Sequence, residues 1–166
     1  MLRGERPPTV EGKYYRAKEA MAEPPRFRDH IPLMIGGSGE KKTIPLAARH
    51  FDHLNIIAGF DELPRKVQVV KENCERIDRD PPATLETSVL AVAIIDENVT
   101  ADVIPDDFKQ QAVYGSPEQI AEQVQTKILD AGVGGVILSP VTSLNGYQPG
   151  GITELGKLLT PPLLGG

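Results

Sequence analysis

The sequence has few of the features that mark several large classes of protein. It contains one cysteine, Cys74, and no tryptophan, so it cannot form an internal disulfide and suits a reducing compartment such as the cytoplasm. It has no run of about 18 apolar residues, which a membrane-spanning helix requires, and its first residues lack the apolar stretch of a signal peptide. Acidic residues outnumber basic ones by 23 to 18, whereas nucleic-acid-binding domains usually present a basic face. We therefore expect an acidic, soluble domain that binds neither membranes nor nucleic acids.

The first 30 residues are poorly suited to a core. The stretch TVEGKYY predicts a small hairpin that turns at Gly12. The stretch EPPRFRDHIP predicts an extended connector, because a residue before proline avoids the helical region. We expect a hairpin and proline-rich connector over residues 1–30, followed by one domain over residues 31–166.

Beyond residue 30, strand-like and helix-like patterns alternate four times. The expected strands lie near residues 31–36, 53–58, 86–95 and 134–139. Because these runs are apolar on both faces, they predict a parallel sheet covered by helices, either an open doubly wound sheet or a (β/α) barrel. A complete barrel needs eight such units in about 250 residues. Four units would form half of a TIM (β/α)8 barrel.

Two of the expected helices have clear sequence signals. One begins at Asp61 and carries a single apolar stripe, made of Leu63, Val67, Val70, Cys74 and Ile77. The other begins at Ser116-Pro117-Glu118-Gln119, with serine at the N-cap and proline at the first helical position. Its buried face is expected to contain Ile120, Val124, Ile128 and Ala131, and Gly132 follows where a helix commonly ends in glycine.

Four segments together resemble the luciferase-like monooxygenase superfamily, namely VEGKYYRAKEAMAEPP, IPLMIGGSGEKKT, AARHFDHLN and GSPEQIAEQV…DAGVGGVIL. The most similar branch is that of the oxidoreductases that use the deazaflavin coenzyme F420. The resemblance runs from about Gly4 to Ile137 and corresponds to the C-terminal half of the family's barrel. Two residues fit this pattern less well. Pro45 lies within an expected helix, where it is tolerated in the first turn if Thr43 is the N-cap. Asp78 follows the second helix, at a position that glycine would occupy more easily.

The resemblance implies a flavin-type cofactor, F420 or FMN, and an incomplete active site. In the family, barrel strands one to four supply most of the wall against the cofactor's ring system, so no catalytic residue is assigned here. A half-barrel would have two bare sheet edges and an uncovered interior of Val, Ile and Leu. We therefore expect pairing, either as a homodimer or with a separately encoded N-terminal half.

The stretch IPLMIGGSGEKKT, residues 31–43, contains the candidate cofactor-binding residues. Glycines let backbone N–H groups approach an anion, hydroxyls and lysines add donors and charge, and the following helix start is partially positive. The residues are Gly36, Gly37, Ser38, Gly39, Lys41, Lys42 and Thr43. The resemblance implies that this loop holds the phosphate of the cofactor. A turn in which glycine serves only geometry is the alternative, and the spacing is not that of a P-loop.

The remaining candidate residues give weaker evidence for a functional site. His30, His50 and His53 lack a further clustered ligand for a metal. His53 and Asn55 could face a barrel cavity, although we expect a role at the surface or strand edge, and we expect Cys74 to be a core residue. The stretch NGYQPGG contains Tyr147, which could close a pocket or lie in a mobile linker.

Three functions fit these observations. The first is a flavin- or F420-dependent oxidoreductase, or its C-terminal half. The second is a non-catalytic subunit or vestigial half-barrel that binds at most an anion. A barrel that binds sugar phosphates is a third, because such loops are not exclusive to flavins. No nucleophile elbow or paired-carboxylate motif supports hydrolysis.

Overall fold

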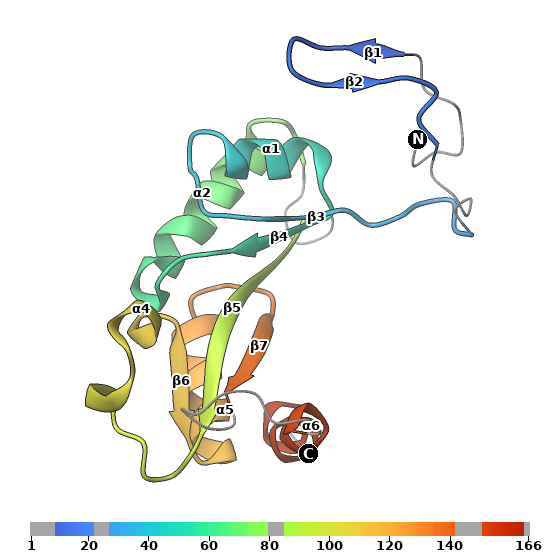
Figure 1. Ribbon diagram of the computed structural model, residues 1–166. Helices are drawn as coiled ribbons and strands as arrows, with labels where there is room; N and C mark the ends of the chain where they lie inside the picture. The colour runs from blue at the N-terminus through green and yellow to red at the C-terminus, as the bar shows by residue number, and fades with distance from the viewer. Residues whose placement is uncertain (1–8, 22–26, 80–84, 142–150, 165–166) are drawn as a thin grey trace. The chain divides into compact units, whose positions relative to one another are not determined.

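The computed structural model describes residues 9–21, 27–79, 85–141 and 151–164 (Figure 1). The chain divides into two compact units, Met1–Leu33 and Met34–Gly166. In the first unit, β1 (Val10–Glu11) and β2 (Arg16–Ala17) pair in antiparallel fashion. The Gly12 N–H donates to the Tyr15 carbonyl at 2.8 Å, so the predicted hairpin is confirmed.

The second unit alternates strands and helices. Its strands are β3 (Met34–Gly36), β4 (His53–Ile56), β5 (Glu86–Ile95), β6 (Ala112–Gly115) and β7 (Val136–Val141), and its helices are α1 (Thr43–His50), α2 (Leu63–Glu75), α4 (Asp106–Lys109), α5 (Pro117–Val124) and α6 (Gly151–Leu164). Short 3-10 turns at Phe60–Glu62 and Ala101–Val103 precede α2 and α4, and a π-helical turn at Gln125–Leu129 extends α5.

All the strand pairs in this unit are parallel, and β5 is at the centre of the sheet (Figure 1). One edge of β5 pairs first with β4, at residues 86–89, and then with β6, at residues 92–95. The other edge pairs with β7. Strand β6 was not predicted, because AVYG is too short to show a period of two.

Helices pack against one face of the sheet. That face carries the alternate residues Leu54, Ile56, Val89, Ala91 and Ala93, which share a core with Ile44 of α1, Leu63 of α2 and Ile120 of α5. The opposite face, called the uncovered face below, presents the exposed side chains of Met34 and Ile137. This face is covered near the carboxyl end of β5, where Ile94 and Ala112 are buried with Ile104. A parallel sheet with helices on one face confirms the predicted half-barrel architecture.

The uncovered face differs in one respect from the expected interior of Val, Ile and Leu. It contains the polar residues His53, Asn55 and Ser88 in the first halves of β4 and β5, and the latter two are buried. Neighbouring strands align these residues, because Asn55 of β4 lies opposite Gly36 of β3 and Ser88 of β5.

Several predicted boundaries shift for local reasons. Strand β3 begins at Met34 rather than Ile31, since Pro32 has no N–H for a ladder. Strand β4 ends at Ile56, two residues early, and β7 is displaced to Val136–Val141. The N-cap of α1 is Lys42 rather than Thr43, which still leaves Pro45 in the first turn.

The two helices with clear signals form largely as expected. Ser116 caps α5 in a capping box with Gln119, and Gly132 has φ +90°. The helix expected to begin at Asp61 is α2, which begins at Leu63. Asp61 lies in the 3-10 turn that precedes it. Ile77 lies beyond the end of α2 and is partly exposed, whereas Val69 and Asn73 are buried.

The end of α2 gives a prediction about stability. Asp78 has φ +56°, and the Arg79 N–H donates to the Cys74 carbonyl at 2.9 Å, as in a Schellman motif. A left-handed conformation costs a non-glycine residue roughly 1 kcal/mol, so we expect Asp78→Gly to raise the free energy of unfolding by about 0.5–1 kcal/mol. Urea denaturation measures the change.

The matched control is Asp130→Gly. Asp130 ends the helical segment that follows α5 in a right-handed conformation, with φ −66°. Glycine there gains no relief of strain and should lower the stability by about 0.5–1 kcal/mol. Equal effects at the two positions would contradict the explanation.

Candidate functional site

The loop between β3 and α1 lies at the carboxyl end of β3, which is the edge where parallel β/α sheets bind ligands. Gly37 has φ +145°, and its N–H donates to the Asn55 carbonyl at 2.9 Å. A Cβ at Gly37 would lie 2.9 Å from Thr43 Cγ2, and one at Gly39 would lie 3.0 Å from Thr43 Oγ1. The loop glycines therefore have a steric role, whether or not a ligand binds.

The start of α1 has the partial positive charge of a helix N-terminus. Among the described residues it has no side-chain cap and no acidic residue in its first turn. The Ile44 N–H donates to the Gly39 carbonyl at 3.0 Å. Lys41 and Lys42 are exposed, while Ser38 and Thr43 are half-buried. The predicted residues thus lie together between the end of β3 and the first residue of α1, with N–H groups, hydroxyls and ammonium groups of the kinds that bind phosphate in other proteins.

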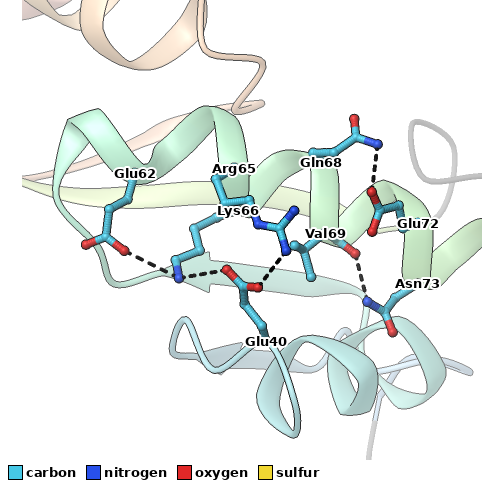
Figure 2. Close-up of polar contacts among 8 residues, drawn as sticks. All are labelled: Glu40, Glu62, Arg65, Lys66, Gln68, Val69, Glu72 and Asn73. Atoms are coloured by element: carbon cyan, nitrogen blue, oxygen red, sulfur yellow. Dashed lines mark hydrogen bonds and ion pairs between the residues drawn. The ribbon is translucent and has the colours of Figure 1, made fainter.

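Glu40, in the middle of this loop, is a residue that the sequence reasoning passed over. Its carboxylate accepts a hydrogen bond from Arg65 Nη2 at 3.0 Å and one from Lys66 Nζ at 3.1 Å (Figure 2). Hydrogen bonds from these two cations lower the pKa of Glu40 below its ordinary value of 4.5. No local pattern could have revealed the contact, because the partners are 25 and 26 residues away.

A series of polar contacts, called the polar chain below, links β4 and β5 on the uncovered face of the sheet. Asn55 Nδ2 donates to Ser88 Oγ at 2.9 Å, and Ser88 Oγ lies 2.7 Å from His53 Nε2. His53 Nδ1 lies 3.6 Å from a carboxylate oxygen of Glu86. The expected role at the surface or strand edge is therefore wrong for Asn55, which is 8% exposed. His53 does lie at the end of its strand, as the first residue of β4.

The other candidates gain no support as reactive groups. Among the described residues, no group of three His, Cys, Asp or Glu side chains is placed to hold a metal ion. Cys74 is buried, and burial raises the pKa of its thiol, so it is a core residue as predicted. Tyr147 lies outside the described residues.

A cavity of about 1060 Å³ lies at the other edge of the sheet. It is lined by His53 and Glu86, which begin their strands, and by Gly134 and Gly135, which precede β7. This is the amino-terminal edge, whereas barrel active sites form at the carboxyl edge. The cavity is therefore separate from the glycine loop.

Comparison with known proteins identifies the family. The model of the luciferase-like monooxygenase family matches residues 1–101, and the chain belongs to this family. No curated protein sequence matches the chain. In the described part of the chain, no helix combines the length and apolar character needed to span a membrane.

Solved structures of the same fold include enzymes that use different cofactors. An F420-dependent secondary alcohol dehydrogenase, in complex with an F420-acetone adduct, is 16% identical with a TM-score of 0.73, over 98% of this chain and 57% of that one. The coenzyme F420-dependent tetrahydromethanopterin reductase from Methanopyrus kandleri is 16% identical, with a TM-score of 0.70, and the match covers 96% of this chain and 59% of the reductase. A riboflavin lyase with modified FMN and its substrate riboflavin is 15% identical with a TM-score of 0.65, over 95% and 48%. The chain thus spans about half the length of these structures.

Proposed function

We propose that this chain is the cofactor-phosphate-binding half of a luciferase-like oxidoreductase that uses FMN or coenzyme F420. The observation that carries the proposal is the glycine loop, which precedes a helix start without a side-chain cap or an acidic first turn. The donors expected to hold the phosphate are the backbone N–H groups of the loop, the hydroxyls of Ser38 and Thr43, and the ammonium groups of Lys41 and Lys42. When bound, the cofactor supplies the hydride or oxygen chemistry, and this chain positions it.

The proposal includes a second half-barrel. The exposed apolar side chains on the uncovered face, Met34, Ile57 and Ile137, need cover in an active enzyme. Strands β3 and β7 each pair with one described strand only, so each offers an edge for further pairing. A second copy of this chain or a separate N-terminal half would supply the missing strands. Light scattering on the purified chain distinguishes a dimer from a monomer that needs another partner.

The central experiment compares cofactors with and without phosphate. We expect FMN to bind more tightly than riboflavin by about tenfold or more, because the ring systems are identical and only FMN offers a dianion to the loop. Coenzyme F420 should likewise exceed a phosphate-free deazaflavin. Fluorescence titration measures all four affinities. Equal affinities for FMN and riboflavin would contradict the phosphate role.

Matched variants test whether the loop holds the phosphate. Lys42→Gln and Thr43→Val should each reduce the preference for FMN over riboflavin by about threefold to tenfold, since the first removes a positive charge and the second a hydroxyl donor from the loop. Arg49→Gln is the control, because Arg49 lies in the last turn of the same helix. It should leave the preference unchanged. The non-catalytic half-barrel of the competing hypothesis would bind phosphate without discriminating between flavin and other phosphate esters.

A further inference from the structure

The glycine loop contains an acidic residue, which is unfavourable in a site for anions. Glu40 lies between Gly39 and the two lysines of the loop, and its side chain is about one-third exposed, at 32%. Figure 2 shows its carboxylate between two cations of α2, one at each oxygen. The contacts are 3.0 Å to Arg65 and 3.1 Å to Lys66.

The two cations are not equivalent. The Arg65 side chain is 63% exposed, and exposed ion pairs contribute little because water screens them. The Lys66 side chain is only 13% exposed, and its ammonium group also lies 3.4 Å from Glu62 Oε2. Lys66 therefore bridges the loop to the start of α2 with most of its side chain out of water.

The bridge has two physical consequences for the loop. Three glycines in the four positions before Glu40 give the backbone many accessible conformations, and an attachment at Glu40 restricts them. The cations also compensate a negative charge that would otherwise repel a phosphate. The hydrogen bond to Glu40 raises the pKa of Lys66, and hydrogen bonds from Arg65 and Lys66 lower the pKa of Glu40, so both groups stay charged near neutral pH.

We infer that Glu40 and Lys66 are positioning residues for the anion site: their ion pair restricts the conformation of the glycine loop and compensates the Glu40 charge beside the bound phosphate. The inference rests on the proposed phosphate role of the loop. Arg65 also contacts Glu40, but we expect it to contribute less than Lys66 to both effects, because water screens its more exposed side chain.

The test uses neighbouring charge removals on one helix. Lys66→Met should reduce the affinity for FMN relative to riboflavin by about tenfold, because it leaves Glu40 next to the phosphate with only the solvent-screened Arg65 as a counter-charge. Arg65→Met removes the same charge one residue earlier and should change the ratio by less than about threefold. Lys66→Arg should retain most of the wild-type ratio.

A double substitution separates charge compensation from simple damage to the helix. Glu40→Gln combined with Lys66→Met removes both members of the pair, so the FMN preference should recover by at least about threefold over Lys66→Met alone. A merely structural role of Lys66 would predict no recovery. Equal losses in Lys66→Met and Arg65→Met would also overturn the inference.

Hydrogen exchange distinguishes failure of this inference from failure of the proposed function. Without any ligand, the amides of residues 37–44 should exchange faster in Glu40→Gln and in Lys66→Met than in the wild type or Arg65→Met. Unchanged exchange overturns the positioning role even if FMN binds. A wild-type chain that binds FMN no better than riboflavin overturns the phosphate role, and exchange then still decides whether the pair orders the loop.

Discussion

Replacing Gly37 by alanine is expected to weaken FMN binding by about tenfold or more and to lower the free energy of unfolding by roughly 1–3 kcal/mol. The cause is backbone strain combined with a close contact. Gly37 has φ +145°, a region that residues with a Cβ rarely adopt, and the new Cβ would lie 2.9 Å from Thr43 Cγ2. Relief of that contact moves Thr43 or the loop, and both belong to the candidate phosphate site.

The adjacent residue provides the control. Gly36 lies at the end of β3 and has no positive φ, and a Cβ there would lie at an ordinary 3.5 Å from Ile57 Cδ1. Gly36→Ala should therefore change the stability by less than about 0.5 kcal/mol. Fluorescence titration and urea denaturation on both variants give the comparison. Similar losses at the two positions would show that the loop responds to any added volume, rather than to the conformation of Gly37.

Ser88→Ala is expected to lower the free energy of unfolding by about 1–3 kcal/mol, although it removes a single oxygen atom. Ser88 is 3% exposed and its hydroxyl contacts both Asn55 Nδ2 and His53 Nε2. The substitution leaves a buried amide without its partner, and such a group pays its desolvation cost without compensation. Thermal and urea denaturation measure the loss.

Ser139→Ala is the matched control for this prediction. Ser139 lies on the uncovered face of β7, in register with Val92 of the neighbouring strand, and is exposed. Its loss should change the stability by no more than about 0.5 kcal/mol. If Ser88→Ala were equally mild, the buried polar chain would contribute little to the fold.

The polar chain and the glycine loop meet at Asn55. The Asn55 carbonyl accepts the Gly37 N–H, while its side chain donates to Ser88. The loop is therefore bonded to a residue inside the sheet and, through Glu40, to α2. Lys41 and Lys42, beside these two attachments, are exposed.

Local features of the sequence predicted most of the fold. The capping box at Ser116 and Gln119 forms because both partners lie within one helical turn, so the spacing alone specifies it. The misfit of Asp78 with a helix end was visible for the same reason, and the structure gives this residue a positive φ. The parallel direction of the strands was predicted from apolar strands separated by helices.

The sequence by itself determined the order of the longer strands and helices, the capping box of α5 and much of the core, because these depend on periodicity and on hydrogen bonds between near neighbours. Only the tertiary structure decided that β5 pairs with both β4 and β6 along one edge. It also brought Glu40 to Lys66 and Asn55 to Ser88, across 26 and 33 residues. Such contacts depend on strand register and on how a helix packs beside a loop, and neither leaves a periodic signal in the chain.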